Sequence, residues 1–182
     1  MSTIIQITEP TMVLNEEVCK SNIARMAAKA KAANVIFRPH FKTHQSREIG
    51  EWFKASGVDK ITVSSLNMVM KFAEWGWNDI TVAFPVNCLE HEKINDLASR
   101  IHLNLLLVHS EGARQLSACL RYPVGVYLGV DTGYHRDGVE INHYEKINRI
   151  MDIVAPDVNI KFEGFLTHAG HTYNARSREE IL

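Results

Sequence analysis

The chain has 182 residues, of which 46% are hydrophobic and 23% are charged, and its net charge is -1. This length allows one α/β domain with a buried core, and this composition excludes an intrinsically disordered chain. The near-neutral charge provides no cationic surface for nucleic acid or for an anionic membrane, so we expect neither as a partner.

Membrane, secreted and zinc-finger proteins also fit the sequence poorly. No segment approaches the roughly 20 apolar residues of a membrane span, and residues 1–8 lack the cationic and apolar runs of a signal or anchor. The cysteines at positions 19, 88 and 119 are odd in number and far apart, which predicts neither a disulfide framework nor a zinc finger. We expect a reducing, cytoplasmic location.

Short β-branched runs alternate with amphipathic runs along the chain, the pattern of repeated βα units on a parallel sheet. After an extended lead-in at 11–14, strands are predicted at 35–38, 60–63, 79–84, 103–108, 124–130 and 161–167. Helices are predicted after the cap Asn15, from near Ile49 to Gly57, at 66–75, at 90–99, after the cap Ser110, and at 144–154.

About six βα units predict an α/β fold that is either the front part of a (β/α)8 barrel or an open, doubly wound sheet. A closed barrel needs eight strands and about 250 residues. Ser177-x-x-Glu180 has the form of a helix capping box, yet the sequence stops at Leu182, before that helix could complete a second turn. We therefore expect residues 1–182 to form one truncated domain without an internal boundary.

Reactive residues in βα proteins gather where strands end, and three such junctions are rich in polar residues: 38–44, 131–138 and 167–173. In the first junction, Lys42 lies between His40 and His44. Desolvation and neighbouring positive charge there would favour the nucleophilic amine that forms an imine with an aldehyde cofactor or a carbonyl substrate. On local sequence alone, a solvated loop lysine is the simpler interpretation of Lys42.

The other two junctions also leave alternatives open. Arg136 could hold a phosphate, carboxylate or phenolate oxygen, or it could be a surface arginine paired with Asp131 or Asp137. His168 and His171 could bind a metal, but their spacing is short and no third ligand is evident. A stacking or hydrogen-bonding role under a planar cofactor fits these two histidines better.

Six segments, taken in order, resemble the amino-terminal part of the D-threonine aldolase and eukaryotic-type D-serine dehydratase group. These are alanine racemase-like, fold-type III pyridoxal phosphate enzymes. The segments are Thr11-Met-Val-Leu14, Asn22-Ile23, Arg38-Pro-His-x-Lys-Thr-His44, Ile61-Thr-Val63, Asp79-Ile-x-Val-Ala-x-Pro-Val86 and Asp131-x-Gly-x-x-Arg-x-Gly138. The resemblance covers nearly the whole chain and is most specific around Lys42. It implies an alanine racemase-like N-terminal barrel, here incomplete and without the family's carboxyl-terminal β domain.

The resemblance also assigns roles to single residues. It implies that Lys42 holds pyridoxal phosphate as a Schiff base and is the catalytic residue. It places Arg136 at the phenolic oxygen of the cofactor and His168 and Tyr173 beside its ring, with His40 in the same cofactor site. No residue of this chain is assigned as a metal ligand.

As a function, the resemblance implies a lyase that cleaves or dehydrates D-amino acids bearing a β-hydroxyl group, acting as a homodimer when full length. A racemase of the same fold, a catalytically silent pyridoxal phosphate carrier and an unrelated α/β binding module are the alternatives. A divalent metal, zinc or manganese, is expected in the full-length protein only.

Overall fold

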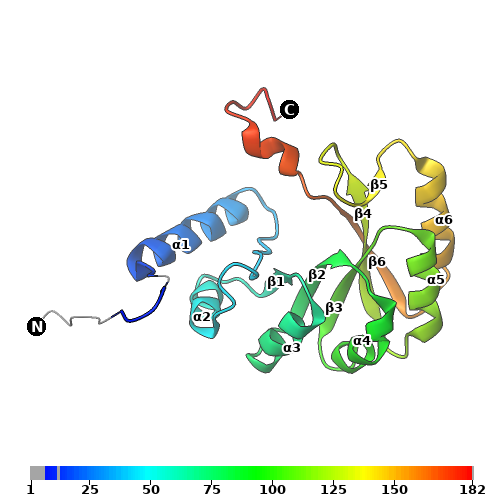
Figure 1. Cartoon of the computed structure of the whole chain (residues 1–182), viewed down its shortest axis with the longest axis horizontal. Helices are drawn as coiled ribbons and strands as arrows, with labels where there is room; N and C mark the ends of the chain where they lie inside the picture. Colours follow the sequence, from blue (N-terminus) through cyan, green and yellow to red (C-terminus); the bar gives the residue numbers. More distant parts are fainter. Residues whose placement is uncertain (1–6, 12, 182) are drawn as a thin grey trace, which may run out of the picture.

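The computed structural model describes residues 7–11 and 13–181, and its centre is a parallel β-sheet (Figure 1). The strands are β1 (Lys60–Val63), β2 (Asp79–Pro85), β3 (His102–Leu107), β4 (Val124–Asp131), β5 (Val139–Glu140) and β6 (Ile160–Leu166). The helices are α1 (Glu16–Ala32), α2 (Arg47–Ala55), α3 (Leu66–Glu74), α4 (His91–Ala98), α5 (Ser110–Cys119) and α6 (Tyr144–Val154), with 3-10 turns η1 (Cys88–Glu90) and η2 (Gly170–Asn174).

The order of the strands decides between the two predicted architectures. The five longer strands pair in parallel in the order β1-β2-β3-β4-β6, and the two-residue strand β5 pairs with the end of β4. This order follows the chain without a reversal, whereas a doubly wound sheet reverses its order at a switch point. The fold is therefore part of a (β/α) barrel, as the first prediction had it.

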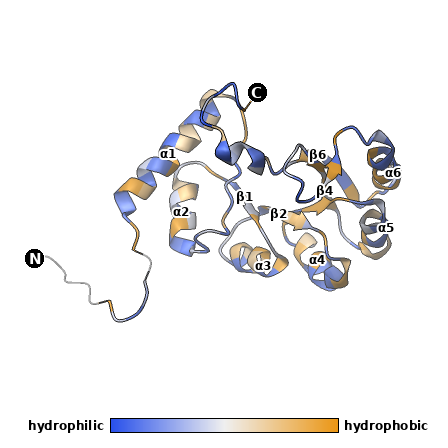
Figure 2. Ribbon diagram, turned by 45° about the horizontal axis from the view of Figure 1, so that its top comes forward, coloured by the Kyte–Doolittle hydropathy of each residue, from blue (hydrophilic) through white to orange (hydrophobic). Residues whose placement is uncertain are grey.

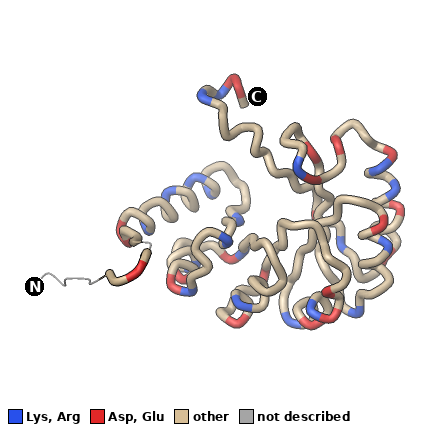
Figure 3. The backbone as a smooth tube through the Cα atoms, in the orientation of Figure 1, with Lys and Arg blue, Asp and Glu red and all other residues tan. Residues whose placement is uncertain are grey.

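Helices α2 to α6 cover one side of the sheet, and the buried core lies between the two layers. Helices α2 to α6 follow one another in an arc along that side in both ribbon views (Figures 1 and 2). Lys, Arg, Asp and Glu are concentrated on the helices and connecting segments (Figure 3). The core of β1 to β4 is aliphatic, with Ile61, Ile80, Leu103 and Leu128 fully buried. Burial of these strands explains their near-continuous apolar runs.

An aromatic cluster joins the loop before α2 to the rest of the core. Phe41 has an exposed fraction of 0%, and its ring centroid lies 5.0 Å from that of Phe53 and 5.1 Å from those of Phe72 and Trp77. The helix that contributes Phe53 ends as expected, with Gly57 just beyond it at a φ of 80°. The position of Phe41 is thus set by side chains from two helices and a loop.

The first predicted strand, at 35–38, is not a regular strand. Pairing occurs later, where the N–H of Thr62 donates to the carbonyl of Pro39 (2.9 Å) and the N–H of Phe41 donates to the carbonyl of Thr62 (2.8 Å). Val35 and Ile36 are 60% and 71% exposed, and no described strand lies on their other side. A short apolar run that finds no strand to pair with does not form a regular strand.

Smaller differences concern caps and termini. His109, not Ser110, caps α5, because His109 Nδ1 accepts from the N–H of Gly112 at 2.8 Å. In the capping box, the N–H of Glu180 donates to Ser177 Oγ (3.3 Å), but only a turn forms there. The expected lead-in at 11–14 has no strand pairing at residues 11, 13 and 14, and residue 12 lies outside the described residues.

Within 7–11 and 13–181, no helix is both long enough and apolar enough to cross a bilayer. Residues 1–6, which form most of the segment 1–8 where a signal or anchor was not expected, lie outside that range.

Candidate functional site

A cavity of about 260 Å³ lies where β1, β2, β3 and β6 end at their carboxyl sides. It brings together four residues predicted from the three separate junctions, namely His40, Lys42, Arg136 and His168. The other lining residues are Arg38, Thr62, Ser64, Ala83, Phe84, Leu106, Asp137, Leu166 and Thr167. The strand-end rule thus located one site formed by residues far apart in the sequence.

Lys42 is presented to the cavity by the turn at 41–44, which divides its side chains between two environments. His40 and Lys42 line the cavity, whereas Phe41 is buried in the aromatic cluster. His44 also faces that cluster, with its ring centroid 4.5 Å from that of Phe41 and 6.1 Å from that of Phe53. Packing of Phe41 and His44 therefore fixes the backbone on which Lys42 stands.

His40 is neutral at neutral pH. Its Nδ1 accepts from the N–H of Lys42 (3.3 Å), and its Nε2 lies 3.5 Å from Ser64 Oγ. Burial and the charge of Lys42 together lower the pKa of His40 to about 4. Burial also lowers the pKa of His44, and a hydrogen bond with the backbone of Ser46 opposes this shift.

These findings correct the expected environment of Lys42. The side chain is exposed rather than desolvated, and neither flanking histidine supplies positive charge. The cations that share the cavity with Lys42 are Arg38 and Arg136. Arg38 belongs to the same junction as Lys42, whereas Arg136 comes from a distant junction that the local sequence around Lys42 does not identify as a neighbour.

Arg136 is held on a loop with a strongly constrained backbone. Asp131 Oδ1 accepts from the N–H groups of Gly133 (2.9 Å), Tyr134 (3.1 Å) and His135 (3.0 Å). The hydrogen bonds from Gly133 and His135 lower the pKa of Asp131 to about 2. At Gly138 φ is 97°, and an added Cβ would lie 2.8 Å from the carbonyl carbon of Val130, so only glycine fits there.

Arg136 forms a salt bridge and also lines the cavity. Its Nε donates to Asp137 Oδ2 at 3.1 Å, which is the surface pair considered from the sequence. Both members of the pair nevertheless line the cavity. The salt bridge is thus part of the site and not an alternative to it.

His168 stands at the end of β6 and forms a wall of the cavity. Burial, Arg136 and Lys42 lower its pKa, while Asp137 opposes them, so the ring is neutral at neutral pH. The Tyr134 ring packs edge-on to His168 with centroids 5.1 Å apart.

Tyr173 does not line the cavity. It is 67% exposed, and it reaches the site only through His168, whose Nε2 lies 3.4 Å from Tyr173 Oη. Tyr173 lies in the 3-10 turn η2, an element that strand periodicity does not predict.

Sequence reasoning gave no role to the base of the cavity. Arg38 lines it and donates from Nη1 to Asp79 Oδ1 (2.7 Å), while Lys60 Nζ donates to Asp79 Oδ2 (2.6 Å). Burial raises the pKa of Asp79, but the hydrogen bonds and charges of Arg38 and Lys60 outweigh it and lower the pKa overall. Ser64, which directly follows β1, could have been found by the strand-end rule.

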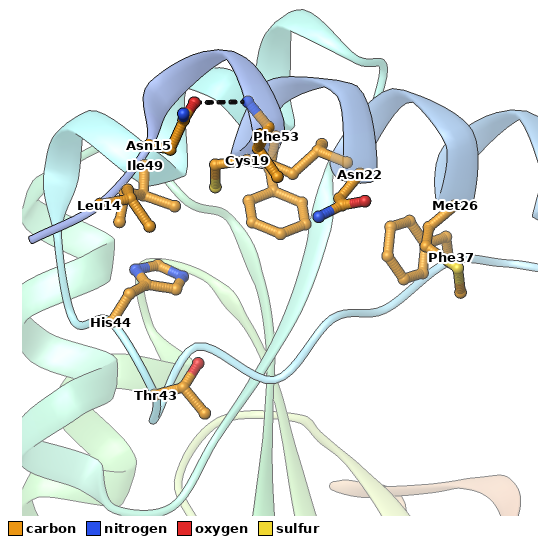
Figure 4. A pocket seen from close by; sticks show the side chains of 12 residues that line it. Leu14, Asn15, Cys19, Asn22, Met26, Phe37, Thr43, His44, Ile49 and Phe53 are labelled. Carbon is orange, nitrogen blue, oxygen red and sulfur yellow. Dashed lines mark hydrogen bonds between the residues drawn. The ribbon is translucent and has the colours of Figure 1, made fainter.

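A larger cavity of about 820 Å³ lies between α1, α2 and the segment that leads to Lys42 (Figure 4). Leu14, Met26, Phe37 and Phe53 give it a largely apolar wall. Ile23 is the one buried residue of α1, so this helix packs loosely over the space. None of the described residues that line this cavity is Lys, Arg, Asp or Glu, and we place the chemistry in the smaller cavity.

The described ranges also show how potential metal ligands are distributed. No group of three or more His, Cys, Asp or Glu side chains there is arranged to hold a metal ion. His171, the second histidine of the third junction, does not line the cavity of Lys42.

The family model and the named relatives that match this chain agree with one another. Residues 14–180 match the alanine racemase N-terminal domain. The chain is 30% identical over 183 residues to the D-threo-3-hydroxyaspartate dehydratase of Delftia sp. (strain HT23), covering 98% of this chain and 48% of the relative. It is 27% identical over 201 residues to the D-serine dehydratase of Dictyostelium discoideum, covering 96% and 48%.

A third relative and a solved structure agree with these matches. The D-threonine aldolase of Arthrobacter sp is 25% identical over 179 residues, covering 96% of this chain and 47% of the relative. The solved structure of the Delftia dehydratase superposes with a TM-score of 0.79 at 28% identity, covering 86% of this chain and 42% of that one. The chain thus spans about half the length of the curated relatives that it matches.

Proposed function

The chain belongs to the alanine racemase N-terminal domain family, and we propose that it is the barrel portion of a pyridoxal phosphate-dependent lyase acting on D-amino acids with a β-hydroxyl group. The observation that carries the proposal is the gathering of Lys42, Arg136 and His168 from three separate loops around one cavity. The names of the relatives supply the reaction class, since they are two dehydratases and an aldolase of D-amino acids.

The side chains of the cavity fit pyridoxal phosphate. Lys42 offers an amine for the aldehyde, and the Nη atoms of Arg136 make no hydrogen bond among residues 7–11 and 13–181, which leaves them for the phenolic oxygen. The neutral ring of His168 offers a wall for a planar pyridine. The volume of about 260 Å³ is just below the range of typical ligand pockets, as suits a molecule with a single ring.

When bound, the cofactor accepts electrons from the bond that breaks at Cα of the amino acid. The side chains of this chain would perform the accompanying steps. The Lys42 amine would hold the cofactor through its aldehyde and, as the free amine, would take or return a proton at Cα of the amino acid. Arg136 donates to the phenolic oxygen, and His40 holds the N–H of Lys42 without adding charge, because its pKa is about 4.

The proposal also covers the cofactor phosphate, a divalent metal and a partner subunit. We assign no residue of this chain to the cofactor phosphate, which barrels of this kind hold with loops after the seventh and eighth strands. A divalent metal, zinc or manganese, would be bound outside residues 1–182, in a homodimer formed by the full-length protein.

The substrate assay tests the proposal directly. With pyridoxal phosphate, the complete gene product that contains this chain should release acetaldehyde from D-threonine, or pyruvate and ammonia from D-serine, and nothing from the L-isomers. Conversion of D-alanine to L-alanine without any such release would make the protein a racemase. Cofactor binding without turnover of any of these amino acids would make it a carrier.

Replacing Arg136 should weaken cofactor binding without unfolding the barrel. Arg136→Ala removes donors to an oxyanion, and a hydrogen bond to a charged group corresponds to roughly tenfold to a hundredfold in Kd. The Tm should stay nearly unchanged, because the Arg136 side chain is 45% exposed. Absorbance titration with pyridoxal phosphate measures the Kd.

The matched control is Arg121→Ala, which removes another exposed arginine, paired with Glu92 at 2.6 Å. Neither residue lines the cavity, so this variant should bind the cofactor like the parent protein. Equal affinity of the Arg136 and Arg121 variants would return Arg136 to a purely surface role.

A further inference from the structure

The carboxylate beside Arg136 has no role in the function proposed above. We propose that Asp137 is a positioning residue, which holds the guanidinium of Arg136 so that its two terminal nitrogens face the cavity; this inference rests on the proposed function. Asp137 Oδ2 accepts from Arg136 Nε at 3.1 Å, and both side chains line the cavity.

The geometry of a guanidinium explains why this contact is useful. Arginine donates as a fork, through Nε with one Nη or through the Nη pair. The bond to Asp137 uses Nε and leaves the Nη pair without a hydrogen bond in the described part of the chain. With its side chain 45% exposed, Arg136 has few packing contacts to fix its rotamer, so the bond to Asp137 restricts it.

A salt bridge between consecutive residues needs an unusual backbone. Successive side chains of an extended strand point to opposite faces, so they cannot meet. Here His135 has a φ of 56° and Gly138 a φ of 97°, on either side of the pair. Asp131 stabilises the bend by accepting from the N–H and from Nδ1 of His135 (3.0 and 2.9 Å).

The negative charge of Asp137, taken alone, predicts that this residue weakens cofactor binding. A carboxylate lining the cavity repels an anionic ligand and offsets the attraction of Arg38, Lys42 and Arg136. If Asp137 acted only through its charge, removing it would strengthen cofactor binding. A positioning role predicts weaker binding, so the sign of the change separates the two.

The test compares Asp137→Ala with Asp137→Asn in the complete gene product. Alanine removes the acceptor, and Kd for pyridoxal phosphate should rise by about tenfold. Asparagine keeps an acceptor oxygen for Nε without the charge, so binding should stay within about twofold of the parent protein. The visible spectrum of the bound cofactor should shift in the alanine variant and be restored in the asparagine variant.

Two controls bracket the effect. Glu92→Ala removes the partner of an exposed arginine, Arg121, neither of which lines the cavity, and should leave both Kd and spectrum unchanged. In an Arg136→Ala background, adding Asp137→Ala should not weaken binding further, because a positioning residue acts only through its partner. Thermal unfolding of each variant confirms that the barrel is intact.

Each outcome decides a specific point. Tighter binding by both Asp137 variants would overturn positioning in favour of simple charge, and unchanged binding by both would make the pair incidental. A parent protein that binds no pyridoxal phosphate at Lys42 would refute the proposed function itself. A parent protein that binds it normally while Asp137→Ala has no effect would refute only the inference on Asp137.

Discussion

Replacement of Lys42 by alanine is expected to abolish covalent attachment of pyridoxal phosphate and to reduce turnover by a factor on the order of 10³ or more. Among the described residues, no other lysine lines the cavity, so none of them is placed to take over the role. The variant should remain folded, because the Lys42 side chain is exposed and makes no side-chain hydrogen bond within 7–11 and 13–181.

Reduction with borohydride, followed by proteolysis and mass mapping, identifies the lysine that carries the cofactor. The parent protein should be labelled at Lys42, and Lys42→Ala should lose the label together with the visible absorption band. Lys93→Ala, which removes an exposed lysine of α4 paired with Glu90, is the control and should keep both. Labelling of any other lysine in the parent protein would refute the assignment of Lys42.

Replacement of Phe41 by alanine should destabilise the fold by about 3–5 kcal/mol, the loss usually seen when a buried phenylalanine is truncated. Phe41 has an exposed fraction of 0% and packs against Phe53, Phe72 and Trp77. Since such a loss is a large part of the stability of a typical domain, much of the protein should unfold. Urea denaturation followed by circular dichroism measures the change.

Two variants separate packing from loss of an aromatic ring as such. Phe41→Leu retains an apolar side chain that fills much of the space, and it should lose less stability than Phe41→Ala. Phe165→Ala removes a phenylalanine that is 58% exposed, and it should have a small effect. If Phe41→Ala were no more destabilising than Phe165→Ala, packing of Phe41 could not be what holds the turn of Lys42.

Much of the sheet was predictable, because buried parallel strands have a strong apolar pattern. The strand Lys60–Val63 and the helix Tyr144–Val154 have the predicted bounds. The prediction failed at 35–38, where the apolar run is present but regular pairing is not. It also missed β5, whose two residues are too few to show a period.

The site was predictable to the extent that strand ends determine it. Lys42, Arg136 and His168 meet because parallel strands end at the same edge of a sheet. The direction of side chains within a loop has no such rule. The position of Tyr173 outside the cavity and the contact between Arg136 and Asp137 both depend on backbone angles that local composition does not set.

The spacing of the paired strands along the chain has a consequence for how much variation in length the connection between β4 and β6 can accept. Paired residues of β3 and β4, such as Asn104 and Gly125, are 21 positions apart, whereas Val124 of β4 and Ile160 of β6 are 36 apart. The free-energy cost of closing the longer connection is higher by only about 0.5 kcal/mol, because the entropy lost on closure grows with the logarithm of length. Insertions beyond Gly138, outside the constrained loop at 131–138, should therefore carry little thermodynamic penalty, which makes the later part of this connection a suitable place for variation in length.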